Sequence, residues 1–349
     1  MVIWHHFHYA FRGAQSNRWY ERPFISGHES VMLFFVLSGY VLSMAVWRGR
    51  QLPYHLYLVR RVTRIYLPYT AALFISAAIG EHFLFSRLQL NGWFHLTWQE
   101  RITWGVIGEG LLVMPVATLN TAFWSLYYEM QMSLIFPFLC LLISRLRMAG
   151  SFLLILIVSL ASVEISQRTS DPYFVAESLR YCGFFVMGAL LSKNHGPLTE
   201  GWKRLGTAFK WLGAAFSFGL YFHFFGILKG GGAVRLGLSD QSQEARADCA
   251  IALGAVGIVA IATSSEKVQR FLDKPFFEYL GRVSYSMYLL HGTVLFALIN
   301  LLYGRVSIPV IAAIYFAVTM PLSHLFLIFV EEPSLQWGKR LTSRWGRSA

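Results

Sequence analysis

Charged residues are scarce in this sequence. They make up 14% of its 349 residues, against roughly 25% in an average soluble domain, whereas hydrophobic residues make up 55%. Apolar runs recur along the whole length of the chain. An ordinary soluble domain is therefore excluded, and the composition predicts a polytopic membrane protein.

Cysteine is also scarce. Cys140, Cys182 and Cys249 each lie in an apolar or small-residue context, so we interpret them as packing residues and exclude a disulfide framework. The spacing of metal ligands is missing as well, and we predict no metal site. The chain also lacks a phosphate-binding glycine loop, a Gly-x-Ser-x-Gly motif and the features of a cleavable signal peptide.

The apolar runs predict helices that cross a bilayer, because a span needs about 20 residues and open sheet edges cannot face lipid. We predict an all-α, polytopic transmembrane helix bundle with about ten spans, the first of them truncated. The predicted spans are residues 1–9, 31–47, 65–85, 123–144, 150–166, 176–192, 208–226, 246–263, 284–303 and 308–330. Residues 103–116 are apolar but contain glycines and a proline, so we interpret them as a re-entrant or interfacial piece.

Basic residues exceed acidic ones, and the formal net charge is +12. In a membrane protein such residues more often anchor cytoplasmic loops than bind nucleic acid, so we expect a lipid bilayer and no nucleic acid as partner. Most lysines and arginines fall in every second loop, and the positive-inside rule places these loops and both termini in the cytoplasm. We expect the protein in the plasma or inner membrane.

The chain shows no internal repeat and no low-complexity linker. We therefore predict a single integral-membrane domain over residues 1–349, with a short basic cytoplasmic tail at 334–349. Trp337 and Trp345 lie beside basic residues in this tail, a combination that is typical of an interfacial anchor.

Three histidines, His5, His6 and His8, lie in the first apolar segment. Consecutive helix positions point about 100° apart, so at most two of these side chains face the interior of a bundle. A polar side chain at membrane depth is costly and is usually functional or paired, whereas at the outer interface it would only bind water or headgroups. Both interpretations stay open at this point.

Two further pieces carry candidate residues. Ser38 lies beside Gly39, where close packing against another helix is a better interpretation than a covalent nucleophile. Arg61 and Arg64 share one face if a helix already begins there. Such a pair can grip a phosphate, and it can equally well keep a loop in the cytoplasm.

Glu129 lies about one and a half turns into a predicted span, one turn after Ser125. An unpaired carboxylate at this depth must be protonated, paired or facing water, so Glu129 is a candidate to orient a histidine. Further along, Ser284, Tyr288 and His291 share a helical face. A lone histidine in this setting more often forms a hydrogen bond between helices than acts as a ligand, but its depth keeps His291 a candidate.

The order and spacing of these pieces resemble the acyltransferase 3 family of ten-span membrane acyltransferases. The family's first helix carries an arginine, ten residues and a histidine. His6 followed by Phe7 is similar to the end of that motif; its arginine would fall before Met1, so we expect the first helix to be incomplete. The remaining matches are Phe34–Tyr40 with Phe-Phe-x-Leu-Ser-Gly-aromatic, Arg61 and Arg64 with Arg-x-x-Arg, Trp124–Glu129 with Trp-Ser-Leu-x-x-Glu, Gly281–His291 with Gly-x-x-Ser-Tyr-x-x-Tyr-Leu-x-His, and Glu332-Pro333 with Glu-x-Pro.

The resemblance implies an O-acetyltransferase-like enzyme that moves an acyl group, most often acetyl, from cytoplasmic acyl-CoA to a hydroxyl of a carbohydrate such as an exopolysaccharide or lipopolysaccharide. No bound cofactor is expected, because acyl-CoA is the donor substrate. Arg61 and Arg64 would hold the CoA phosphates, and His6, or its neighbour His5, would act as general base. The transfer would be direct or would pass through a transient acyl-enzyme, and we favour the direct route.

The remaining candidates would support this reaction. Glu129 would orient or charge-balance the histidine, and Ser38, Ser125 or Tyr288 would donate to the developing oxyanion.

Two other interpretations stay open. A ten-helix bundle with buried polar residues also suits a carrier or flippase for a lipid-linked sugar, although the lack of an internal repeat favours the enzyme. An incomplete first helix also suits a truncated, inactive family member. The sequence specifies neither the acceptor, nor the acyl chain length, nor the oligomeric state.

Overall fold

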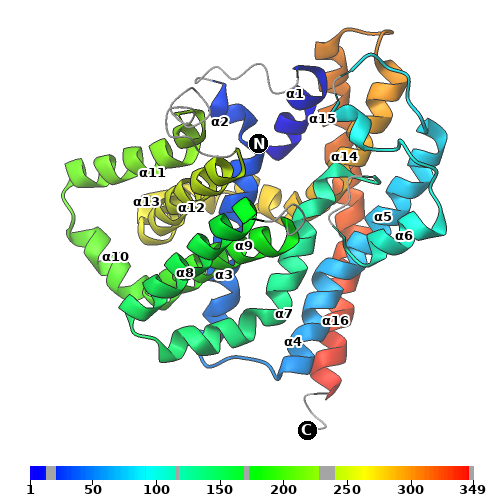
Figure 1. Ribbon diagram of the computed structural model, residues 1–349. Helices are drawn as coiled ribbons and strands as arrows, with labels where there is room; N and C mark the ends of the chain where they lie inside the picture. Colours follow the sequence, from blue (N-terminus) through cyan, green and yellow to red (C-terminus); the bar gives the residue numbers. More distant parts are fainter. Residues whose placement is uncertain (13–20, 91, 115–117, 169–172, 228–239, 346–349) are drawn as a thin grey trace. The chain divides into compact units, whose positions relative to one another are not determined.

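A computed structural model describes the chain except for residues 13–20, 91, 115–117, 169–172, 228–239 and 346–349 (Figure 1). The described residues are mostly helical and contain no β-strand, so the all-α prediction is confirmed. Within the described ranges, eight helical segments are long and apolar enough to cross a membrane. They are Gly27–Trp47, Tyr54–Phe83, Thr121–Arg145, Met148–Ser166, Val175–Lys193, Gln243–Ser264, Pro275–Leu302 and Ile308–Ser343.

Two of the ten predicted spans are not among these eight. Span 1–9 corresponds to α1 (Val2–Arg12), a helix of 11 residues, and span 208–226 to α11 (Thr207–Ile227), which has 21. The segment 103–116 contains α6 (Trp104–Leu111), whose eight residues are too few to span a bilayer, as the sequence predicts.

Several helices extend beyond the apolar runs that predict them. The predicted span 65–85 belongs to a continuous helix formed by α4 (Tyr54–Arg61), the π-helical turn η2 (Val62–Tyr66) and α5 (Leu67–Gly80). Likewise α14 (Pro275–Leu302) begins before residue 284. Backbone hydrogen bonds continue a helix through polar residues, so hydropathy alone does not show where such a helix ends.

The predicted tail is helical as far as Trp345. The last span consists of α15 (Ile308–Phe326) and the π-helical turn η8 (Leu327–Glu331), and it continues as α16 (Glu332–Trp345). Figure 1 shows α16 in red beside α4 in blue, and Arg60 donates to Thr342 at 3.0 Å between them. Trp337 and Trp345 remain exposed, as an interfacial anchor requires.

The chain divides into two compact units, both built from separated segments. The first unit comprises Met1, 17–51 and 134–274, and the second comprises 2–16, 52–133 and 275–349. The first unit contains α2 (Arg22–Ile25), α3 (Gly27–Trp47), α8 (Met148–Arg168), α9 (Tyr173–Lys193), α10 (His195–Arg204), α11, α12 (Asp240–Ser264) and α13 (Glu266–Leu272). The second contains α1, α4 to α6 and α14 to α16, and the boundary falls within α7 (Trp124–Arg145).

In the first unit, α3 packs closely on α9. A Cβ atom added to Gly39 would overlap the backbone of Phe185, and one added to Gly188 would overlap the backbone of Val36. The predicted close approach of a helix at Gly39 is therefore confirmed. The neighbouring α8 leaves most of its apolar side chains exposed, since only 11% of its span is buried. Such a surface fits contact with lipid.

In the second unit, aromatic residues hold α1 against α14. Phe7 of α1 belongs to a buried cluster with Phe296 of α14 and Tyr315 of α15, and Trp98 from the segment before α6 belongs to it as well.

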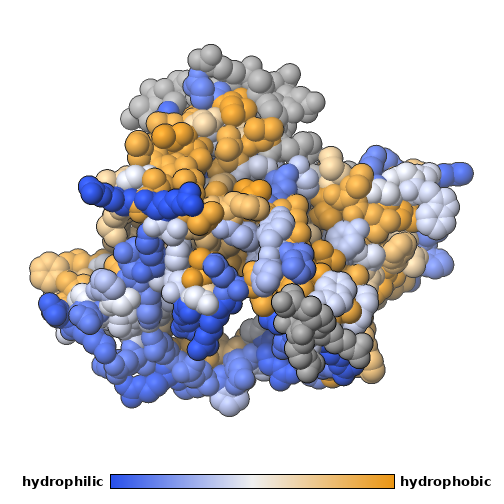
Figure 2. Space-filling model, turned by 90° about the horizontal axis from the view of Figure 1, so that it is seen from below, coloured by the Kyte–Doolittle hydropathy of each residue, from blue (hydrophilic) through white to orange (hydrophobic). Residues whose placement is uncertain are grey.

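Figure 2 shows the molecule from below the view of Figure 1, and on this face hydrophilic side chains gather in patches bordered by hydrophobic ones. This mixture is typical of the ends of membrane-spanning helices.

Candidate active site

The packing of α1 on α14 brings together two of the predicted site residues. His6 Nδ1 lies 2.7 Å from His291 Nε2, and the two rings are nearly parallel at 8°. The His291 side chain is fully buried, whereas His6 is only partly buried. His6 is therefore the more accessible member of the pair.

Neighbouring rings surround His6. The Trp93 ring lies 5.2 Å from the His6 ring and stacks on Phe296 at 5.4 Å, centroid to centroid. The His5 ring stacks instead on Tyr9, at 5.4 Å. Of the two histidines proposed as base, His6 is thus the one that the fold joins to the motif on α14.

The hydroxyl groups of Ser125 on α7 and Tyr288 on α14 lie 2.6 Å apart, and Tyr288 lies one turn before His291. Tyr288 also donates to the carbonyl oxygen of Ala122, at 2.5 Å. A carbonyl only accepts, so the phenolic proton points to Ala122 and the Ser125 hydroxyl donates to the Tyr288 oxygen. Donation from either group to an oxyanion, as the sequence predicts, would first require one of these hydrogen bonds to break.

Asn120 fixes the start of α7 against α14. Its Oδ1 accepts from the backbone of Ala122 at 2.9 Å, and its Nδ2 donates to Leu289 O and to Thr293 at 3.4 and 3.2 Å. The amide group packs on Gly292, where an added Cβ would overlap it. A side chain at position 292 would therefore push apart the two elements that carry Ser125 and His291.

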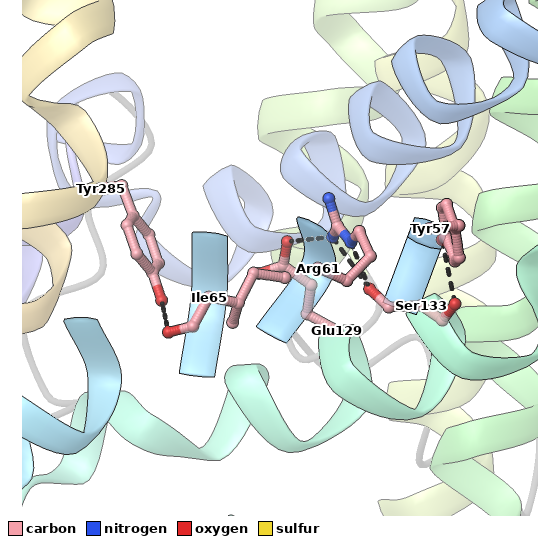
Figure 3. Close-up of polar contacts among 6 residues, drawn as sticks. All are labelled: Tyr57, Arg61, Ile65, Glu129, Ser133 and Tyr285. Carbon is pink, nitrogen blue, oxygen red and sulfur yellow. Dashed lines mark hydrogen bonds and ion pairs between the residues drawn. The ribbon is translucent and has the colours of Figure 1, made fainter. Parts of the chain in front are cut away.

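Glu129 lies in a second buried group, shown in Figure 3. Its Oε1 lies 3.2 Å from Nη2 of Arg61, and the Nε and Nη2 atoms of Arg61 donate to Ser133 at 3.0 and 2.8 Å. Both charged side chains are buried, with 8% of Arg61 and 5% of Glu129 exposed. Glu129 Oε2 has no hydrogen-bond partner among the described residues.

This arrangement differs from the predicted role of Glu129. No hydrogen bond joins it to His6 in the described part of the chain; its partner is Arg61, and the partner of His6 is His291. The reason is the placement of the helices. The extension of α4 beyond the apolar run brings a guanidinium to α7, where it neutralises the buried carboxylate.

Arg61 and Arg64, which the sequence predicts on one face if a helix begins there, differ in burial. Arg61 is buried and paired, whereas Arg64 is exposed. Arg64 lies in the π-helical turn over Val62–Tyr66, whose i→i+5 bonding winds the backbone more loosely than an α-helix, so α-helical spacing does not describe the two positions. The exposed guanidinium of Arg64 is therefore the one that a phosphate can contact directly.

Sequence inspection missed several residues of these groups. Ser133 follows Ser125 and Glu129 at intervals of one helical turn, a spacing that would have identified it. Glu331 is buried and accepts from Ser286 at 2.5 Å; as a carboxylate in an apolar run it carried the same signal as Glu129. Asn120 and Trp93 lie in irregular segments, and the local pattern gave no sign of them.

The remaining candidate, Ser38, belongs to the first unit and is partly exposed on α3. The three cysteines are free, with Cys140 and Cys182 buried and Cys249 partly exposed. Within the described residues no group of three or more histidine, cysteine, aspartate or glutamate side chains is arranged to hold a metal ion.

A family model described as an acyltransferase domain, Acyl_transf_3, matches residues 1–328. The match includes His6, the Arg61–Glu129 pair and His291. No curated protein and no solved structure matches the chain.

Proposed function

Because the chain belongs to the acyltransferase 3 family and is a multi-pass membrane acyltransferase, we propose that it transfers an acetyl group from cytoplasmic acetyl-CoA to a hydroxyl of a carbohydrate. The observation that supports this best is the position of His6, whose Nδ1 is bonded to the buried His291 while the ring stays partly exposed. An imidazole that is held on one nitrogen and reachable on the other suits a general base.

In the proposed reaction the acceptor hydroxyl gives its proton to Nε2 of His6, the nitrogen that His291 does not occupy. The hydroxyl oxygen attacks the thioester carbonyl, a C–O bond forms, and the C–S bond breaks with its electron pair on the CoA sulfur. His6 then returns the proton to that sulfur. The products are an acetyl ester and CoA, and no acyl-enzyme is formed.

The donor would bind through the exposed guanidinium of Arg64. Arginine binds phosphate oxygens through two parallel hydrogen bonds, and CoA carries several phosphates. Arg61 would act indirectly, because its charge is already balanced by Glu129 and its nitrogens donate to Ser133. With the predicted topology, this end of α4 faces the cytoplasm, where acyl-CoA is found.

The acceptor would be a cell-envelope carbohydrate, such as an exopolysaccharide or a lipopolysaccharide, acetylated by an enzyme in the plasma or inner membrane with both termini in the cytoplasm. The family match supports acyl transfer, and the acceptor class is our extension of it.

Membranes from cells that express the full chain test this proposal. They would be supplied with acetyl-CoA labelled in the acetyl group, and label would be counted in extracted carbohydrate. Wild type should transfer label, and His6→Ala should lose about two to four powers of ten in rate, the usual contribution of a general base. If the variant labels carbohydrate at the wild-type rate, the assignment of His6 is refuted. If wild type labels no carbohydrate, a carrier that moves sugar without consuming acyl-CoA is favoured.

A further inference from the structure

His291 is fully buried, and its Nδ1 faces two backbone carbonyl oxygens of its own helix. Tyr288 O lies at 2.7 Å and Met287 O at 3.2 Å. Carbonyl oxygens only accept hydrogen bonds, so the proton of a neutral His291 resides on Nδ1. Its Nε2 then carries a lone pair, and this atom faces His6.

The lone pair of His291 decides the protonation of His6. Two unprotonated nitrogens 2.7 Å apart would repel each other, so His6 Nδ1 must carry the proton and donate it to His291 Nε2. In the neutral His6 ring the other nitrogen, Nε2, is then the unprotonated one. The tautomer of His6 is thus fixed by a chain of hydrogen bonds that ends at the backbone of α14.

We infer that His291 is a positioning residue that holds His6 in the Nδ1–H tautomer and thereby makes its Nε2 the base. This inference rests on the proposed function and adds a residue to it. In serine hydrolases a carboxylate orients the catalytic histidine in the same way. Here a neutral imidazole takes that position, and the carboxylate of Glu129, which the sequence predicts for it, is bonded to Arg61.

The burial of the two rings supports this division of roles. The His291 side chain is 0% exposed. A group so enclosed cannot take a proton from a bound acceptor. It can still accept from Nδ1 of His6, so that positive charge spreads over two rings as His6 takes up the hydroxyl proton.

The experiment compares two substitutions at position 291 with the wild-type chain in membranes. In His291→Gln the amide keeps both an acceptor for His6 Nδ1 and a donor for the carbonyl of Tyr288. In His291→Leu the volume is kept but both functions are lost. We expect the leucine variant to lose about 100-fold in kcat and the glutamine variant about tenfold or less, with the KM for acetyl-CoA unchanged in both.

Tyr315→Phe is the matched control, because it removes a hydrogen bond to the backbone of His291 and leaves the pair of rings intact. We expect this variant to transfer acetyl groups at close to the wild-type kcat. Thermal unfolding of each purified variant reports on folding independently of activity. A merely structural role would lower the unfolding temperature in parallel with kcat and would not distinguish glutamine from leucine.

The outcomes separate the inference from the proposed function. A leucine variant with wild-type kcat, or a glutamine variant as inactive as leucine, overturns the inference while acetyl transfer by wild type stands. If leucine does not fold, the folded glutamine variant decides: kcat within about tenfold of wild type supports the inference, and a 100-fold loss overturns it. Absence of transfer by wild type overturns the proposed function, and the inference with it.

Discussion

His6 and His291 form a hydrogen bond of 2.7 Å although 285 positions separate them in the sequence. The bond joins the first helix of the chain to α14 and connects the two motifs with intramembrane histidines. The position of either histidine alone does not show whether it is functional or only forms a hydrogen bond to a neighbouring helix. Their contact, with one ring buried and the other partly exposed, is the observation from which we propose a separate role for each.

The first prediction concerns the choice between His5 and His6. The His5 ring stacks on Tyr9, whereas the hydrogen bond to His291 comes from His6, so His5→Ala should change the rate of acetyl transfer by about threefold or less. Initial rates in membranes, normalised to the amount of protein, check this. A loss of 100-fold or more in His5→Ala would assign the base to His5 instead.

The second prediction concerns donor binding. Arg64 is exposed, so Arg64→Ala should leave the unfolding temperature unchanged and raise the KM for acetyl-CoA about 10- to 100-fold, the value of one charged hydrogen bond to a phosphate. Arg60→Ala is the matched control, because this exposed arginine precedes the π-helical turn and donates to Thr342. An equal rise of KM in both variants would indicate a general effect of charge rather than a phosphate contact at Arg64.

The third prediction concerns the buried pair of Arg61 and Glu129. Arg61→Ala leaves a carboxylate buried without its partner, and we expect a loss of about 3 to 5 kcal/mol in the free energy of unfolding. The double variant Arg61→Met, Glu129→Leu should recover most of this loss, since apolar residues often replace a buried ion pair without cost.

Chemical unfolding in detergent, followed by tryptophan fluorescence, measures these differences. Equal stability of Arg61→Ala and wild type would show that Glu129 is not held as an ion. If the double variant is stable and fully active, the pair serves the fold alone.

The fourth prediction concerns two glycines on α14. Gly292→Ala would force the added methyl group against the bonded amide of Asn120, so we expect a loss of about 1 to 3 kcal/mol. Gly281→Ala on the same helix meets nothing within 4 Å and should gain about 0.5 to 1 kcal/mol from helix propensity. Unfolding temperatures that move in the same direction would contradict the assigned contact at Gly292.

The helices were predictable because the signal for them is local. A run of apolar residues must form a helix in a bilayer, and this rule locates eight spans without any knowledge of their packing. Helix ends were less accurate. At the start of α14 and along α16, hydrogen bonding continues through polar residues whose hydropathy resembles that of a loop.

The candidate site was predictable residue by residue but not in its pairing. Glu129 was identified because a charged carboxylate inside the membrane costs free energy, yet any nearby cation can offset that cost. Which one neutralises it depends on how α4 lies against α7, and the structure selects Arg61. The π-helical turn over Val62–Tyr66 is likewise invisible to an argument from α-helical spacing, and so is the difference in burial between Arg61 and Arg64.

The sequence by itself determined that the chain is an all-helical membrane protein, that it carries the motifs of its family, and which polar residues lie at depth. Composition and spacing are sufficient for this, because the bilayer acts on each segment separately. Only the tertiary structure decided that His6 bonds to His291, that Glu129 bonds to Arg61, and that the protons of Ser125 and Tyr288 are already in use. A hydrogen bond requires two groups to approach within about 3 Å, and helix packing alone controls that approach.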